Sequence, residues 1–467
     1  MALEALTVAP NRRMLATANG QPFFWLADTA WELFHRLTLA EAGEYFALRR
    51  RQGFNLIQAV ALAEFDGLHT PNPQGRVPLC GDDPARPNEL YFRDVDAIVR
   101  LAAEKELYIG FLPTWGDKVH AGLWGRGPVV FTVENARSFG RFLGRRYRND
   151  SNIVWILGGD RPAAGYEALW EAMHAGLADG LERRPLTAYH PMGGTSSSQD
   201  LADAAWLDVN LLQSGHGQSD APTWAMVAAD WQRTPPKPVL DAEPNYEGHP
   251  IDPFSRKWQP EYGRFDDYDV RKQAYRSVFA GACGFTYGHT SIFQFWPHRF
   301  EPSAFPHLPW REAVYAPGAR QLQYLKNLLL SRPYFSRVPA DELLLDHQPP
   351  HPENRDLTEA ARAIHAVATR DSEGSYAMVY LPLREQNVEV DLRGLPGPVR
   401  AWWFDPRVGR AHAAGEHPNR ATKFTSPIAG PDWVLVLDAA GSDFPPPGGP
   451  MRRSAGGVDA PGGAATD

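Results

Sequence analysis

A carboxylate ends the segment Asn152 to Asp160, which reads Asn-Ile-Val-Trp-Ile-Leu-Gly-Gly-Asp. Its apolar stretch at residues 153–157 is typical of a strand buried on both faces in a parallel sheet. The two glycines that follow let backbone and ligand approach closely, and they place Asp160 at the carboxyl end of the strand. The alternative is that Asp160 only caps the turn at Arg161-Pro162.

A second acid, Glu243, follows another predicted strand at residues 237–242 and lies within Asp241-Ala-Glu-Pro-Asn-Tyr-Glu247. Pro244 would fix the chain direction just after it. In such a pair, one carboxylic acid protonates a leaving oxygen, and the other attacks or activates water, as in glycoside hydrolysis. A salt bridge to a barrel arginine is the alternative for Glu243. Glu247, which lies deeper in the same loop, is the rival nucleophile.

The ends of the other predicted strands supply candidates for binding a substrate. Hydroxyl groups of a sugar would be bound by polar side chains, and its apolar ring faces would stack on aromatic ones. For each aromatic residue, packing in the core is at least as probable a role. The polar candidates are Asp28, Gln58, Asp117, His190, Gln213, His216 and His289, and the aromatic candidates are Trp31, Trp115, Tyr246 and Trp296.

Histidines at three strand ends also raise the alternative of a metal-dependent hydrolase. That class usually has a His-x-His on its first strand, where this chain has Leu26-Ala27-Asp28, and an aspartate where it has His289. We therefore predict no metal and no cofactor. The histidines are expected to bind sugar hydroxyls, to hold the acids in place, or to be core residues.

The elements that must position these residues alternate between strand and helix. A capping box at Thr38-Leu-Ala-Glu41 opens one of the helices. Repeated alternation predicts a closed α/β fold, a (β/α)₈ TIM barrel, whose strand ends meet at one mouth. An open doubly wound sheet would carry a glycine-rich phosphate loop after its first strand, and Asp28-Thr-Ala-Trp31 is not one. The predicted strands are residues 23–28, 55–61, 108–115, 153–157, 186–190, 206–212, 237–242 and 284–287.

Beyond Val338 the pattern changes to short strands separated by turns. The hairpin signal Asp371-Ser-Glu-Gly374 is one of these turns, and the region predicts a small all-β sandwich. The expected domains are a barrel at residues 1–337, a β-sandwich at 338–441 and a disordered Pro/Gly-rich tail at 442–467. The predicted strands of the sandwich are residues 363–369, 376–381, 388–392, 399–404 and 433–437.

The composition of this 467-residue chain limits the kinds of partner that we expect it to bind. A formal charge of −8 argues against nucleic acid, and an aromatic content of 12%, with 15 Trp, favours carbohydrate. Two cysteines exclude a disulfide framework. The chain shows neither a long apolar span nor the pattern of a signal peptide, so we expect a cytoplasmic protein without membrane contact. The oligomeric state is left open.

Several motifs, in order, resemble those of the apiosidase-like glycoside hydrolases, glycoside hydrolase family 140. The resemblance covers about residues 10–330. The region from Val338 to Leu437, with Arg400-Ala-Trp-Trp-Phe-Asp-Pro406, is similar to the β-domain that follows this barrel in the family and is labelled collagen-binding. The motifs are residues 22–33, 55–60, 112–117, 156–160 and 241–247.

The resemblance implies a retaining glycosidase with Asp160 as acid/base and Glu243 as nucleophile. The characterised activity of the family is release of apiose-linked oligosaccharide from the pectin rhamnogalacturonan II. Without an export signal, an imported oligosaccharide or another glycoside is the expected substrate. The alternative is a non-catalytic protein that binds carbohydrate or matrix on a barrel scaffold, which would need neither acid.

Overall fold

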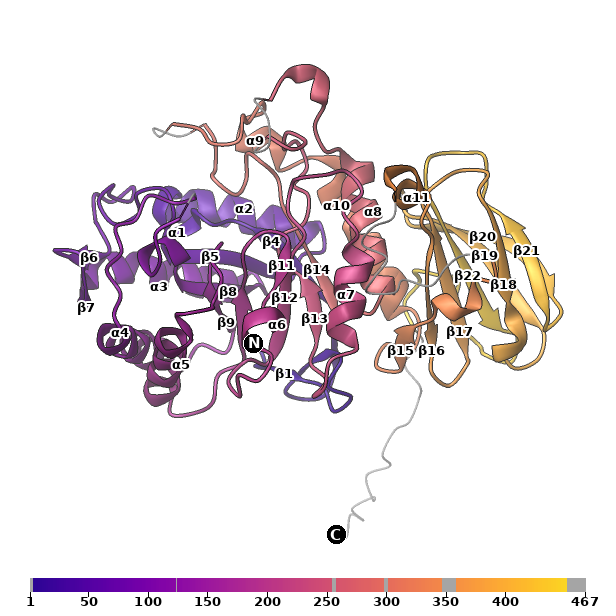
Figure 1. Ribbon diagram of the computed structural model, residues 1–467, viewed down its shortest axis with the longest axis horizontal. Helices are drawn as coiled ribbons and strands as arrows, with labels where there is room; N and C mark the ends of the chain where they lie inside the picture. The colour runs from indigo at the N-terminus through magenta and orange to yellow at the C-terminus, as the bar shows by residue number, and fades with distance from the viewer. Residues whose placement is uncertain (1–2, 123, 254–257, 298–300, 347–357, 452–467) are drawn as a thin grey trace, which may run out of the picture.

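The computed structural model describes residues 3–122, 124–253, 258–297, 301–346 and 358–451. The chain forms a barrel followed by a β-domain, which lies to the right in Figure 1. Eight parallel strands pair in a closed ring, so the predicted TIM barrel is confirmed. The strands are β4 (Trp25–Thr29), β5 (Leu56–Leu62), β8 (Tyr108–Thr114), β9 (Ile153–Gly158), β10 (Thr187–His190), β12 (Val209–Gln213), β13 (Val239–Asp241) and β14 (Gly284–Tyr287).

Helices cover the outside of the ring. The predicted capping box is present at the start of α2, where Thr38 and Glu41 bond reciprocally to backbone N–H groups. The long helices are α2 (Leu39–Arg51), α3 (Glu89–Glu104), α4 (Val133–Arg146), α5 (Glu167–Leu181), α7 (Thr223–Trp231), α8 (Asp267–Phe279) and α10 (Pro317–Leu330), and the short ones are α1 (Leu33–Arg36), α6 (Ser198–Leu201), α9 (Trp310–Ala313), η1 (Gly116–Lys118) and η2 (Pro260–Tyr262).

A few barrel boundaries differ from the sequence prediction. The first strand begins at Trp25, because Phe23 belongs to a separate small sheet. Residues 206–208 precede β12 rather than forming its start. Between β5 and α3, residues 79–87 form a short hairpin. The additional strands are β1 (Leu6–Val8), β2 (Leu15–Thr17), β3 (Pro22–Phe23), β6 (Leu79–Cys80), β7 (Asp83–Pro87) and β11 (Thr195–Ser196).

The β-domain is an antiparallel sheet of six strands with a further two-stranded sheet, which confirms the predicted sandwich. The predicted strand at residues 363–369 begins only at Val367, because residues 359–363 form the short helix α11 (Glu359–Ala363). The strands are β15 (Arg337–Pro339), β16 (Val367–Asp371), β17 (Tyr376–Leu381), β22 (Trp433–Ala439), β19 (Val399–Asp405) and β20 (Arg410–His417) in the large sheet, and β18 (Asn387–Asp391) and β21 (Ala421–Thr425) in the small one; η3 (Asp341–Leu343) and η5 (Leu392–Gly394) lie between strands.

Helix α8 of the barrel faces the β-domain (Figure 1). The buried Arg271 guanidinium lies 2.9 Å from Asp432 of the β-domain, and the rings of Tyr275 and Tyr380 stack with centroids 5.0 Å apart. Buried ion pairs and stacked rings hold the two domains in one arrangement.

The first residues of the predicted tail contact this assembly. Within residues 442–451, the ring of Phe444 lies edge-on against Tyr376, and the Arg332 guanidinium lies 4.7 Å from its centroid. Residues 452–467, where disorder was also expected, lie outside the described residues.

Candidate active site

Asp160 is positioned by the two glycines that precede it. Gly158 and Gly159 have φ of 90° and 114°, and Asp160 itself adopts a left-handed φ of 55°. A Cβ at Gly158 would lie 2.3 Å from the His190 carbonyl oxygen, and one at Gly159 would lie 2.8 Å from the Trp115 ring. Only glycine fits this turn, which brings Asp160 off the end of β9 into the barrel mouth.

Glu243 lies beyond the end of β13, and its carboxylate is held by two histidines, one at the end of β10 and one after β12. His190 Nε2 lies 3.0 Å from Oε2, and His216 Nε2 lies 3.3 Å from Oε1. Below it, the interior side chain of Gln58 donates to the Ala242 carbonyl oxygen at 3.0 Å. The carboxylate therefore has a fixed orientation.

The two acids meet at the mouth. Ligand atoms of Asp160, His190 and Glu243 all lie within 4.8 Å of one another. Asp160 is half-buried, while Glu243 is only 6% exposed. A carboxyl group open to a substrate thus stands directly across from one that the protein holds rigidly.

The protein shifts the pKa values of the two acids in opposite directions. Burial and then the charge of Glu243 raise the pKa of Asp160 to about 6, while a hydrogen bond from Gln213 opposes the shift. Burial alone would also raise the pKa of Glu243, but the contacts with His190 and His216 outweigh it and lower that pKa to about 2. Near pH 6, one acid can donate a proton while the other is ionised.

The predicted aromatic residues lie behind the acids rather than in front of them. Trp31 and Trp115 are each 1% exposed, and their rings lie 5.2 and 5.5 Å from that of His190. The buried Tyr246 ring lies 4.3 Å from His216. Of the two roles considered for Trp31, Trp115 and Tyr246, their burial favours packing, because they lie against the histidines that hold Glu243.

Three of the residues predicted to bind substrate have bonding partners within the protein. Asp28 accepts hydrogen bonds from Tyr45 and Arg49 of α2, each at 2.5 Å, in the wall between strand and helix. Asp117 pairs with Lys118 at 2.9 Å and accepts from the Gly127 N–H at 2.8 Å.

His289 is the third residue of this group. It is buried, and its Nδ1 accepts from the Ser291 N–H at 3.0 Å. Burial and the charge of Arg49 lower its pKa to about 3. The partners of Asp28, Asp117 and His289 give each residue a structural role, and contact of any of them with substrate stays a prediction.

Trp296 and Glu247 complete the sequence candidates. Trp296 is half-buried, and its backbone bonds to Ser291 and Trp310. The carboxylate of Glu247, the rival nucleophile, accepts from Tyr287 at 2.7 Å and from the Gly318 N–H at 3.2 Å, at the start of α10. Both of its oxygens are engaged in fixing that helix, so Glu247 is not available as a nucleophile.

Glu64 is a site residue that the sequence reasoning missed. It follows β5 directly, is fully buried, and its Oε1 has no hydrogen-bond partner among the described residues. The charges of Asp160 and Glu243 both act on it. The sequence signal for Glu64 is an acid just past the end of a predicted strand, a position from which Gln58 is the candidate named above.

Asp160, His190 and Glu243 also form a set that could hold a metal ion. Two carboxylates and an imidazole suit zinc or another divalent transition metal. Because each ligand comes from a different strand, sequence spacing could not reveal the set. Catalysis without a metal stays a prediction.

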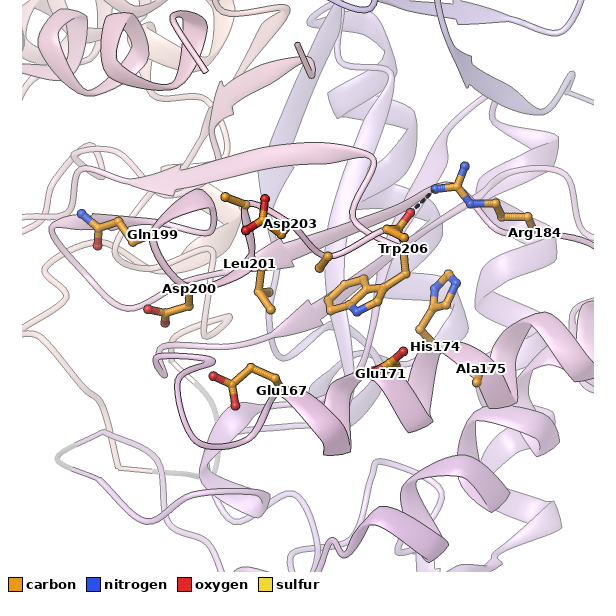
Figure 2. A pocket seen from close by; sticks show the side chains of 13 residues that line it. Glu167, Glu171, His174, Ala175, Arg184, Gln199, Asp200, Leu201, Asp203 and Trp206 are labelled. Atoms are coloured by element: carbon orange, nitrogen blue, oxygen red, sulfur yellow. Dashed lines mark hydrogen bonds between the residues drawn. The ribbon is translucent and has the colours of Figure 1, made fainter. Parts of the chain in front are cut away.

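A surface pocket of about 680 Å³ lies elsewhere, outside the barrel next to α5 (Figure 2). His174 of α5 stacks on Trp206 there, with ring centroids 5.7 Å apart. Neither Asp160 nor Glu243 lines this pocket, so it is separate from the acid pair.

The barrel fold and the acid pair at its mouth indicate one class of protein, and solved structures that resemble this chain support that class. One structure titled "Glycoside hydrolase" has 33% identity and a TM-score of 0.83, and covers 94% of this chain and 98% of its own. A structure titled as a glycoside hydrolase family 5 protein from Bacteroides vulgatus has 31% identity and a TM-score of 0.82, covering 94% of each chain. The barrel is that of a glycoside hydrolase, and its neighbours indicate a glycosidase.

Residues 9–336 match the family described as "Apiosidase-like, catalytic domain", and the chain belongs to this family. Residues 353–438 match "Putative collagen-binding domain of a collagenase". No curated protein sequence matches the chain. Within the described residues, none of the helices has the length and apolarity needed to cross a membrane.

Proposed function

We propose that this protein is a retaining glycoside hydrolase in which Glu243 is the nucleophile and Asp160 the acid and then the base. The observation that carries this is the closeness of the two acids, whose nearest oxygens lie within 4.8 Å. Direct attack on an anomeric carbon requires carboxyl groups about 5–5.5 Å apart, while an intervening water requires roughly 6.5–9.5 Å.

In the first step, an oxygen of Glu243 forms a bond to the anomeric carbon as the glycosidic bond breaks. The proton of Asp160 passes to the leaving oxygen. Esterification removes the charge of Glu243, which is one cause of the raised pKa of Asp160. The pKa of Asp160 then falls, so the ionised carboxylate takes a proton from the water that cleaves the ester.

The substrate we propose is a plant-type glycan or oligosaccharide, including an apiose-linked one. The family match at residues 9–336 supports this proposal. Because family membership does not fix the sugar, a screen of aryl glycosides that includes a β-apioside is the first experiment.

The stereochemical test follows that screen. NMR should show a first-formed product that retains the anomeric configuration of the substrate. Azide should rescue Glu243→Ala and give a glycosyl azide of inverted configuration. Asp160→Ala should lose less activity on substrates with good leaving groups than on other substrates, because good leaving groups need little protonation. A first product of inverted configuration from the unmodified enzyme would exclude the retaining mechanism.

The competing hypothesis is a carbohydrate- or matrix-binding protein without catalysis. It predicts saturable binding without turnover, and equal binding by the wild type and Glu243→Gln. The opposite pKa shifts of Asp160 and Glu243 favour catalysis, because a binding site gains nothing from holding one acid protonated and one ionised.

A further inference from the structure

Trp31 and Trp115 do not offer a ring face on which a sugar could stack, but Trp124 does. This residue lies in the loop between β8 and α4, which leaves the barrel at its mouth, and it is half-buried. Its ring lies edge-on to Phe65, with centroids 5.7 Å apart. Part of the indole therefore remains open on the side of the barrel where the acids lie.

Two strand ends hold the Trp124 loop in place. The indole N–H donates to Glu64 Oε2, and the Arg126 N–H donates to the Glu64 carbonyl oxygen at 3.1 Å. On the other side, the Arg161 guanidinium donates to the Trp124 carbonyl oxygen and, at 2.8 Å, to that of His120. Since Arg161 directly follows Asp160, the indole is fixed relative to the proposed acid.

Aromatic rings continue from Trp124 toward the nucleophile. Phe65 lies 6.1 Å from Phe293, which lies 5.7 Å from Tyr246, centroid to centroid. Tyr246 in turn contacts His216, one of the two histidines that hold Glu243. Phe293 and Tyr246 are buried, so in this row of rings Trp124 and Phe65, which are half-buried, are the ones that can offer a face to the apolar side of a sugar ring.

Glu64, which accepts the hydrogen bond from the Trp124 indole, is a buried acid with other acids close to it. Burial raises its pKa well above the ordinary value, as do the charges of Glu32 and Asp160, while the bond from Trp124 opposes this. A neutral carboxyl accepts the indole N–H at Oε2 as well as an amide would. Its Oε1 has no hydrogen-bond partner among the described residues.

We infer that Trp124 is the aromatic platform of the subsite that binds the leaving-group ring beside Asp160, and that Glu64 is the positioning residue that orients its indole. We place Trp124 on the leaving-group side for two reasons. Asp160 protonates the leaving oxygen, and Arg161, the residue after Asp160, bonds to the Trp124 loop. This inference rests on the proposed function and adds the residue that contacts the leaving group.

The kinetic test compares two glycosides of one sugar, a p-nitrophenyl glycoside and a methyl glycoside. Only the first has a leaving-group ring that can stack. Trp124→Ala should lower kcat/KM for the p-nitrophenyl glycoside about two- to tenfold more than for the methyl glycoside, the range of one aromatic contact. Trp124→Phe, which keeps a ring, should recover most of the difference. An equal loss on both glycosides would overturn the inference.

Glu64 is tested through the indole signal of Trp124 in protein labelled with ¹⁵N-tryptophan. The peak is identified by its absence from Trp124→Phe. Glu64→Gln still offers an acceptor and should leave the peak near its wild-type position, whereas Glu64→Ala should move it and reproduce the selective loss on the p-nitrophenyl glycoside. If Glu64→Ala leaves both unchanged, Glu64 does not position Trp124.

A binding experiment separates this inference from the proposed function. Glu243→Gln is titrated with each p-nitrophenyl glycoside of the screen, and the Trp124 indole peak should shift on binding. Turnover by the wild type without a Trp124 shift would overturn the inference and leave the proposed function intact. A Trp124 shift without turnover of any glycoside would support the platform and exclude the glycosidase.

Discussion

At the scale of single residues, the two carboxylic acids of the site, Asp160 and Glu243, have different surroundings. Asp160 is half-buried beside the charge of Glu243 and accepts a hydrogen bond from the Gln213 amide, and its pKa rises to about 6. Glu243 has two histidines against its oxygens, and its pKa falls to about 2. This asymmetry supports the proposed assignment of Asp160 as acid and Glu243 as nucleophile.

The first prediction concerns the pH dependence of this pair. Activity requires protonated Asp160 and ionised Glu243, so kcat/KM should fall as the pH rises above about 6. In Glu243→Gln, the pKa of Asp160 should drop, because the neighbouring charge is lost while burial remains. Carboxyl ¹³C NMR titration of both proteins measures this shift. An unchanged or higher pKa in Glu243→Gln would contradict the assignment.

The second prediction is that activity needs no metal. Asp160, His190 and Glu243 could bind one, but a ligand carboxylate must be ionised, and the mechanism requires a proton on Asp160. Exhaustive chelation should leave kcat unchanged, with metal content followed by mass spectrometry. Loss of activity that added Zn²⁺ restores would show that the set is a metal site.

At the scale of elements, helix packing determines how tightly the barrel closes around the site. Helices α4 and α5, which flank the strand before Asp160, pack through glycines. A Cβ at Gly176 of α5 would lie 2.1 Å from the Arg137 carbonyl oxygen of α4. By contrast, Gly43 of α2 has room, since its added Cβ would lie 3.6 Å from Leu101.

These two glycines give a matched pair of variants. Gly176→Ala should lower the free energy of unfolding by about 1–3 kcal/mol, because the helices must separate. Gly43→Ala should raise it by roughly 0.5–1 kcal/mol, because alanine favours a helix. Urea denaturation measures both. Equal effects would mean that close packing does not constrain α4 and α5.

At the scale of the whole molecule, the β-domain supports the barrel without contributing either acid. Its contacts are with α8 and the end of the barrel, and they include the buried pair of Arg271 and Asp432. Removing one partner of a buried pair leaves an uncompensated charge in the interior. The exposed pair of Arg370 and Glu342 provides a comparison on the same domain.

Asp432→Ala should therefore destabilise the protein by about 3–5 kcal/mol. Glu342→Ala should change stability by no more than about 1 kcal/mol. Thermal and urea unfolding measure the difference. At temperatures where Asp432→Ala is folded, its chemical rate should equal that of the wild type, and so should that of Trp403→Ala. A rate reduced as far as in Glu243→Gln would assign the β-domain a part in catalysis.

The sequence by itself determined the alternation of elements and the place of both acids. Short apolar stretches rich in β-branched residues and bounded by turn residues favour strands buried on two faces, and the glycines before Asp160 are required by a turn with no room for a side chain. These are local properties, so the strands before Asp160 and Glu243 were predicted within a few residues of their observed bounds.

Only the tertiary structure decided which way each side chain faces and what it meets. Successive residues of a strand point to opposite faces of the sheet. An error of one residue in a predicted strand end therefore places a side chain at the barrel mouth when it actually lies in the wall between strand and helix. Asp28, expected at the mouth, bonds to Arg49 behind the strand for this reason. The bond from Trp124 to Glu64 joins segments 60 residues apart, and neither local pattern contains it.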